Sequence, residues 1–256
     1  MTESTPGSFI GWEPTAAGFL LVLFRCTSLM MTAPLFGTQA VPQRVRMSLS
    51  VMVTLAVFQG AGMPRFVAWD QMSPLLGAAV TETLIGLATG LAARFAIEAA
   101  TAAGHAAGLS MGLGFSAVID PLHGQDSTAL SQILSFCALG AAVAAGIHRD
   151  AIAWLCRSIM DSPPGSVLDI SALSGIIIAE AARSTALSIR LAFPVMAAIL
   201  FGYVAAGLLG RTAPQMNLNN IGFAIALLCG GAALYYVSPL FAEAVAREAR
   251  RVFTSG

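Results

Sequence analysis

Charged residues inside apolar stretches are the first candidates for chemistry in this chain of 256 residues. Arg25 lies in the middle of the apolar run 15–36, where an arginine costs about 2.5–3.5 kcal/mol on membrane-insertion scales. It needs a charged partner, water or a protein interface, unless a tilted or shallow helix lets it snorkel to the surface. The sequence leaves both interpretations open. Further charges lie in segments predicted to be helical: Glu82, Arg94, Glu98, Glu180, Arg183 and Arg190.

The spacing of these charges predicts some of their partners. Arg94 precedes Glu98 by four positions and Glu180 precedes Arg183 by three, and residues so spaced are neighbours on a helix surface. Glu82 has no such neighbour and must find its partner elsewhere in the fold. We expect these charges to be buried, to meet neighbouring subunits or to line an aqueous channel.

The polar residues form no recognisable catalytic or metal-binding pattern. Asp120 and His123 are the nearest pair, and Pro121 between them favours a turn over a site. The metalloprotease, nucleophile-elbow and phosphate-loop motifs are absent from the sequence, and the four cysteines are scattered without CxxC spacing. We therefore expect no enzyme activity, no cofactor and no metal. The formal net charge of zero gives no electrostatic footprint for nucleic acid.

The composition indicates what kind of elements position these residues. Hydrophobic residues make up 57% of the chain and charged residues 10%, against roughly 25% charged in soluble domains. The mean hydropathy is +0.78. These values predict an all-α integral membrane protein of about six apolar helices with short connections. The apolar runs are 15–36, 45–63, 75–98 with a weaker continuation to 110, 128–147, 151–160, 172–209 with a kink near Pro194, and 221–242.

The segment 111–127, MGLGFSAVIDPLHGQDS, interrupts this pattern. Irregular backbone at membrane depth is tolerated only where it is buried in protein or lines a cavity. The segment is either a loop packed between helices or a hydrophobic plug that keeps a pore dry, since apolar constrictions gate by dewetting. The candidate plug residues are Met111, Gly112, Leu113, Gly114, Phe115, Val118, Ile119, Asp120 and Pro121.

Three blocks of sequence, in order and nearly from end to end, resemble the FliR family of type III export proteins. They are FRCTSLMMTAPLFGTQAVPQRVRMSLS at 24–50, GHAAGLSMGLGFSAVIDP at 104–121, and LAFPVMAAILFGYVAAGLLGRTAPQMNLNNIGF at 191–223. The third block contains a hairpin turn with Arg211 and Pro214. The total length also fits the family.

The resemblance implies a FliP-like helical part over 1–170, followed by a FliQ-like helical hairpin over 171–256. It implies a non-enzymatic subunit that joins FliP-like and FliQ-like proteins in the flagellar export gate, with FlhB-like and FlhA-like proteins as further partners. Unfolded flagellar proteins would pass through this gate, in the bacterial inner membrane at the flagellar basal body. In the family, the segment that matches 111–127 plugs the closed pore.

Two alternatives to this function remain at the level of sequence. The homologous subunit of a virulence injectisome would share the fold. A self-contained membrane transporter or channel would instead favour an inverted repeat with paired broken helices. The chain shows one clear break and no repeat.

Overall fold

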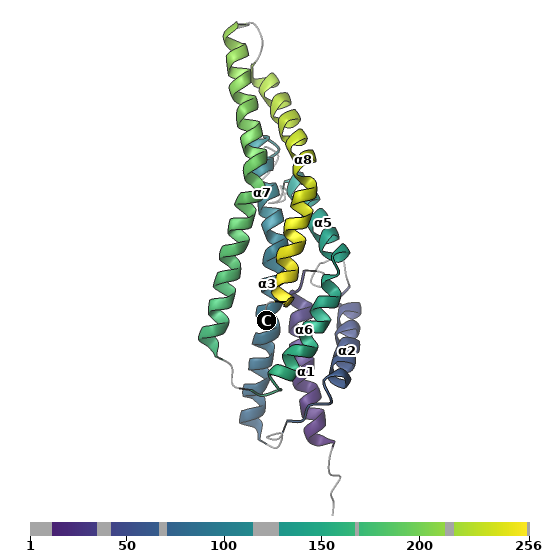
Figure 1. Cartoon of the computed structure of the whole chain (residues 1–256). Helices are drawn as coiled ribbons and strands as arrows, with labels where there is room; N and C mark the ends of the chain where they lie inside the picture. Colours follow the sequence, from purple (N-terminus) through teal and green to yellow (C-terminus); the bar gives the residue numbers. More distant parts are fainter. Residues whose placement is uncertain are drawn as a thin grey trace, which may run out of the picture. The chain divides into compact units, whose positions relative to one another are not determined.

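The computed structural model describes residues 12–34, 42–66, 71–114, 128–166, 169–212 and 218–254. The regular structure of these residues is entirely α-helical, as the composition predicts, with seven helices where about six were expected (Figure 1). The helices are α1 (Glu13–Thr32), α2 (Gln43–Gly60), α3 (Met72–Ser110), α5 (Ala129–Ala144), α6 (Ile147–Asp161), α7 (Ile170–Thr212) and α8 (Leu218–Thr254).

Four of these helices are long and apolar enough to cross a membrane, namely α1, α3, α7 and α8. The helices α5 and α6 qualify together as a fifth span with a short break. Gly146 lies in that break with a φ of 83°, a left-handed conformation that glycine adopts without a steric penalty. The prediction of an integral membrane class is confirmed.

The helices α3 and α8 are longer than the strongly apolar runs in the sequence predict. The expected run 75–98 lies in the N-terminal part of α3, which continues without interruption to Ser110. The last apolar run was expected to end at 242, but α8 continues to Thr254. Its charged final turns carry apolar residues at intervals of four, and these are buried: Phe241, Val245, Ala249 and Phe253. The last turns of α8 are thus amphipathic, and the number of charged residues in them does not by itself indicate this.

The helix α7 contains Pro194 in its interior. Proline removes one backbone hydrogen bond, and membrane helices accommodate this loss more readily than soluble ones. The predicted run 172–209 therefore forms a single helical element from Ile170 to Thr212.

The chain divides into two compact units. The first contains residues 1–94, 147–178 and 252–256, and the second contains residues 95–146 and 179–251. The helices α3 and α7 each contribute one part to each unit. The division near residue 170 that the resemblance implies concerns homology to two other proteins, and it stays a prediction.

In the first unit, α1 lies close against α3 at two glycines. A Cβ atom on Gly86 would overlap the hydroxyl of Ser28 and the carbonyl oxygen of Arg25, and one on Gly90 would overlap the hydroxyl of Thr32. Small residues four apart let helix backbones approach closely in membranes. This close approach brings the polar side chains of α1 within reach of those on α3.

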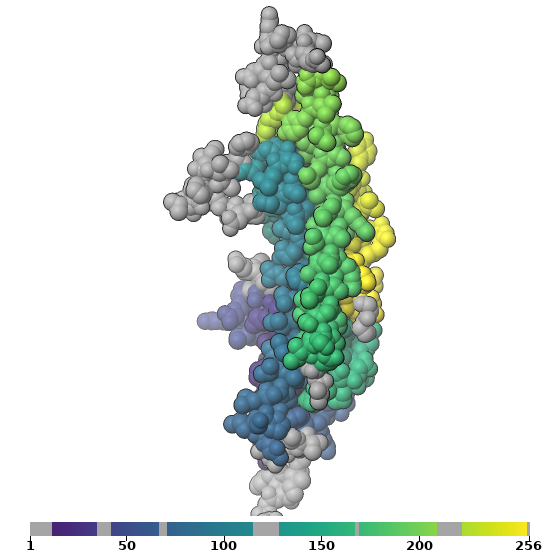
Figure 2. Space-filling model, turned by 90° about the vertical axis from the view of Figure 1, so that its left-hand side faces the viewer, coloured from purple at the N-terminus to yellow at the C-terminus, as the bar shows by residue number. Residues whose placement is uncertain are grey.

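In the second unit, two more glycines of α3 face the beginning of α5. A Cβ on Gly104 would lie 2.7 Å from the Cα of Ser131, and one on Gly108 would lie 2.7 Å from the hydroxyl of Thr128. That hydroxyl caps α5 by accepting a hydrogen bond from the backbone N–H of Ser131. The helix α7 lies beside this part of α3 (Figure 2), where Ser184 donates a hydrogen bond of 2.6 Å to the carbonyl oxygen of Phe95.

Candidate functional site: the end of α3 and a buried ion pair

Arg25 and Glu82 form a buried ion pair in the first unit. The Nε of Arg25 lies 2.5 Å from Oε2 of Glu82, and the two side chains are 0% and 1% exposed. The remaining guanidinium nitrogens donate to the carbonyl and hydroxyl oxygens of Ser158 in α6, at 2.8 and 2.9 Å, and to the carbonyl of Ser162, at 3.1 Å. Arg25 therefore does not snorkel, because each of its guanidinium nitrogens donates to a protein oxygen.

The second oxygen of Glu82 binds the connection between α6 and α7. Its Oε1 accepts a hydrogen bond of 3.1 Å from the backbone N–H of Gly165. Gly165 has a φ of +85°, and a Cβ at this position would overlap the ring of Phe66. Only glycine therefore fits this turn without strain. The ion pair joins α1, α3, the end of α6 and the loop before α7.

The other charges singled out in the sequence have different environments. Glu180 and Arg183 form the ion pair that their spacing predicts, with a separation of 2.5 Å. Arg94 and Glu98 on α3 and Arg190 on α7 have exposed side chains. Exposed charges on apolar helices fit contact with partner subunits or water, and that role stays a prediction.

The end of α3 explains how the segment 111–127 begins. The N–H of Leu113 bonds the carbonyl of Gly108 at 2.9 Å, and the N–H of Gly112 bonds that of Leu109 at 3.0 Å. With Gly112 in the left-handed region at a φ of 80°, this is the Schellman arrangement that ends helices. The first glycine of the sequence break is therefore a helix stop, and the chain leaves the helix axis there.

Met111, directly before this stop, is packed inside the second unit. Its side chain is 2% exposed and lies in a buried cluster with Val195 and Ile199 of α7 and Ala226 of α8. A Cβ on Gly230 of α8 would overlap the terminal methyl group of Met111. Met111 therefore anchors the root of the segment, and Leu113 packs against the same cluster.

The rest of the predicted plug and of the hairpin turn lies outside the described residues. This holds for Phe115, Val118, Ile119, Asp120 and Pro121, and for Pro214. The backbone of Arg211 belongs to the last turn of α7. Gly114 is the last residue described before the gap, and a Cβ there would overlap the side chain of Leu109.

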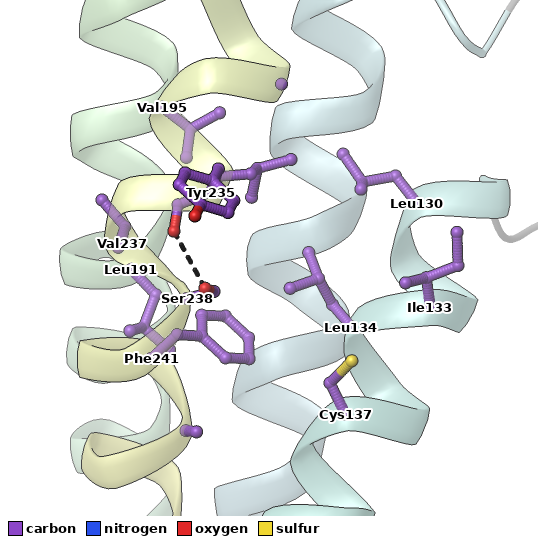
Figure 3. Close-up of a pocket in the computed structure, with 13 residues that line it drawn as sticks. Leu130, Ile133, Leu134, Cys137, Leu191, Val195, Tyr235, Val237, Ser238 and Phe241 are labelled. Atoms are coloured by element: carbon purple, nitrogen blue, oxygen red, sulfur yellow. Dashed lines mark hydrogen bonds between the residues drawn. The ribbon is translucent and has the colours of Figure 1, made fainter.

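The second unit also contains an apolar cavity of about 380 Å³ between α5, α7 and α8. Figure 3 shows that Ser238 in its lining donates a hydrogen bond of 2.9 Å to the carbonyl oxygen of Tyr235. No lining residue is charged. Its polar lining groups are those of Cys137, Tyr235 and Ser238. Its lining includes Leu130, Ile133, Leu134, Leu191, Val195 and Phe241.

Within the part of the chain that the structure describes, no three His, Cys, Asp or Glu side chains converge as metal ligands. The groups with unusual environments are an ion pair that holds helices together and an apolar anchor at a helix end. These arrangements hold helices together.

Sequence reasoning missed the partners that complete both sites. Ser158, Ser162 and Gly165 bind the ion pair from positions far along the chain, and Gly230 makes room for Met111. Gly165 carried the clearest signal, because a glycine after two prolines predicts a tight turn. The turn could be predicted, but its contact with Glu82 could not.

The sequence is similar to known proteins over most of its length. The family described as bacterial export proteins, family 1, matches residues 16–252. The flagellar biosynthetic protein FliR of Escherichia coli K12 is 30% identical over 243 residues, which cover 94% of this chain and 91% of that protein. FliR of Caulobacter vibrioides is 27% identical over 210 residues, covering 82% and 84%. FliR of Bacillus subtilis is 27% identical over 207 residues, covering 80% and 79%. The chain therefore belongs to family 1 of the bacterial export proteins, and its resemblance to the FliR proteins is confirmed.

Proposed function

We propose that this chain is a non-enzymatic subunit of the flagellar protein export gate, in the inner membrane at the basal body. The observation that carries the proposal is the match to the bacterial export family over residues 16–252. Relatives that align over most of their length bear the name flagellar biosynthetic protein. The apolar helices place the chain in a membrane, where an export gate must lie.

The chain works, in this proposal, in a complex with FliP-like and FliQ-like subunits, next to FlhA-like and FlhB-like proteins. The helices α7 and α8 support a complex because they expose large side chains along much of their length, among them Phe193, Phe201, Leu228 and Tyr236. Lipid tails are as apolar as these side chains, so burial against a partner depends on close packing and shape.

The segment 111–127 is proposed as the plug of the closed pore. The Schellman stop at Gly112 turns the chain away from α3, and the packing of Met111 fixes the point from which it departs. The next residues of the segment are mostly apolar, as dewetting of a narrow pore requires. A segment that is held in place at Met111 and is apolar beyond it is suited to blocking ions, and it can still be displaced by an entering polypeptide.

Co-expression tests the assembly. The chain, with an affinity tag, is produced together with the FliP-like and FliQ-like proteins of the same organism and purified through the tag. We expect a stable complex that contains all three proteins. A homogeneous oligomer of this chain alone would contradict the proposal and favour the self-contained transporter.

Ion conductance of the assembled complex tests the plug. Serine replaces Leu113, Phe115, Val118 and Ile119 together, which keeps the length of the segment but makes it polar. We expect a steady ion leak in the closed state, because a polar constriction stays wet. The matched control replaces Asp126, which is not among the candidate plug residues, with asparagine, and it should leave the pore closed. An assembled serine variant that conducts no ions would refute the plug.

A further inference from the structure

The proposed function makes no use of the Arg25–Glu82 pair, which is nevertheless the most deeply buried charged group in the first unit among the described residues. A buried ion pair is weak evidence for stability, since apolar side chains of similar volume often replace such pairs with no loss or with a gain. The pair therefore calls for a role other than net stabilisation.

The apolar side chains of α3 in the first unit define its register less firmly than its glycine and polar contacts do. Its buried apolar residues there are all alanines: Ala78, Ala88, Ala92 and Ala93. A shift of one helical turn, about 5.4 Å, would exchange Ala88 and Ala92, although it would also put a side chain at the place of Gly86 or Gly90, where a Cβ overlaps α1. Helices in lipid also gain little from the hydrophobic effect on association. Apolar packing alone therefore distinguishes neighbouring registers only weakly.

The polar groups distinguish them sharply. Arg25 bonds one carboxylate oxygen and three further oxygens from α6 and its C-terminal end, while Glu82 also accepts from Gly165. A displacement of α1 along α3 by one turn would separate the two charges and leave both buried without a partner. Breaking a buried pair is far more costly than replacing both partners.

We propose that the Arg25–Glu82 pair is a register lock. It selects one alignment of α1 on α3 and, through Gly165, holds the connection from which α7 begins. Gly165 is itself at the surface, and its bond to Glu82 helps to tie this turn to the interior, together with the buried Pro164 and the ring of Phe66. The lock acts within this chain and does not rest on the proposed function. Both of its tests, the distance between α1 and α3 and the unfolding equilibrium, are measured on this chain alone.

The test separates specificity from stability in the full-length chain, reconstituted in lipid nanodiscs. The double variant Arg25→Met/Glu82→Leu removes both charges with side chains of similar volume, and the two single variants leave one charge unpaired. Spin labels report the register from cysteines placed at Phe24 of α1 and Val80 of α3, both exposed, after the native cysteines are replaced. Unfolding is followed in parallel by denaturant titration.

We expect each single variant to raise the unfolding equilibrium constant on the order of 10²–10³-fold. The double variant should stay within tenfold of the parent chain, yet its distance distribution should broaden or gain a second peak. If a single variant does not insert into the nanodisc, the distance distribution of the double variant still tests the lock. The matched control, Glu243→Leu/Arg247→Met, removes an exposed ion pair and should change neither readout.

Two results would overturn the lock. A double variant as unstable as the single ones would make the pair a net stabiliser. A stable double variant with the narrow distance distribution of the parent chain would show that packing alone sets the register.

Discussion

The contact between Met111 and Gly230 offers a quantitative test of how the segment 111–127 is anchored. Met111 is almost fully buried, and a Cβ on Gly230 would overlap its terminal methyl group and lie 3.2 Å from Cδ1 of Ile199. The two residues thus share one small volume between α3 and α8. The perturbations are Met111→Ala, Gly230→Ala and the double variant.

The expected magnitudes follow from this shared volume. Methionine-to-alanine changes in soluble cores cost about 2–5 kcal/mol. We expect about 2 kcal/mol here, because a chain unfolded in lipid keeps its apolar side chains in hydrocarbon and only the packing is lost. Gly230→Ala overpacks the site and should cost about 1 kcal/mol, the low end of the range, because methionine is flexible. In the double variant the new methyl group enters the space left by Met111. Its cost should be about 1 kcal/mol less than the sum of the single costs.

The assay is a denaturant titration of the chain in bicelles, with helicity as the signal. Gly231→Ala is the matched control on the same helix, since a Cβ on Gly231 would meet nothing within 4 Å. It should change the unfolding free energy by less than about 0.5 kcal/mol. Additive single costs, within about 0.5 kcal/mol, would mean that the residues do not share a volume and would refute the anchor.

Four further predictions follow from local geometry. Gly90→Ala should destabilise the first unit by about 1–3 kcal/mol in the same titration, because its methyl group meets Thr32. Gly165→Ala should cost a similar amount, about 1–3 kcal/mol, because its φ is positive and the ring of Phe66 fills the space. Arg157→Met should speed hydrogen exchange in the last turn of α8, since Arg157 donates to the carbonyl of Phe253 at 2.8 Å. Hydrogen bonds from the hydroxyl of Ser171 and from the N–H groups of Ala172 and Ser171 lower the pKa of Asp169, which caps α7. A lowered folded-state pKa means that this cap is present at neutral pH and is lost as pH falls through it. Hydrogen exchange in the first turn of α7 should therefore speed up in acid, relative to other turns, and Asp169→Asn should remove that pH dependence.

Each of these predictions has an outcome that contradicts it. Gly77→Ala is the control for Gly90, because its Cβ would meet nothing within 4 Å, and equal costs for the two would exclude a specific contact. A Gly165 variant with unchanged stability would mean that the turn relaxes without strain. Unchanged exchange in Arg157→Met would show that the end of α8 needs no cap from α6. A first turn of α7 that exchanges in acid only as fast as other turns would exclude a role for Asp169.

Local signals in the sequence were sufficient to predict most of the helices. Runs of apolar residues long enough to span a bilayer predict helices wherever they lie, and the spacing of Glu180 and Arg183 predicts their ion pair. The glycine at 112 likewise marks the end of α3. The last turns of α8 were missed, because the buried apolar positions in that region are interleaved with arginines and glutamates. Each of these signals acts over a few residues along one helix.

The composition and the order of motifs in the sequence determined the membrane class, the helical fold and the family. Only the tertiary structure decided which residues meet. Arg25 finds Glu82 across 57 positions and Ser158 across 133, and Gly230 makes room for Met111. These contacts depend on how far one helix is shifted along another. Spacing within a helix does not encode that shift, because alanine-rich faces accept several alignments and the polar and glycine contacts choose among them.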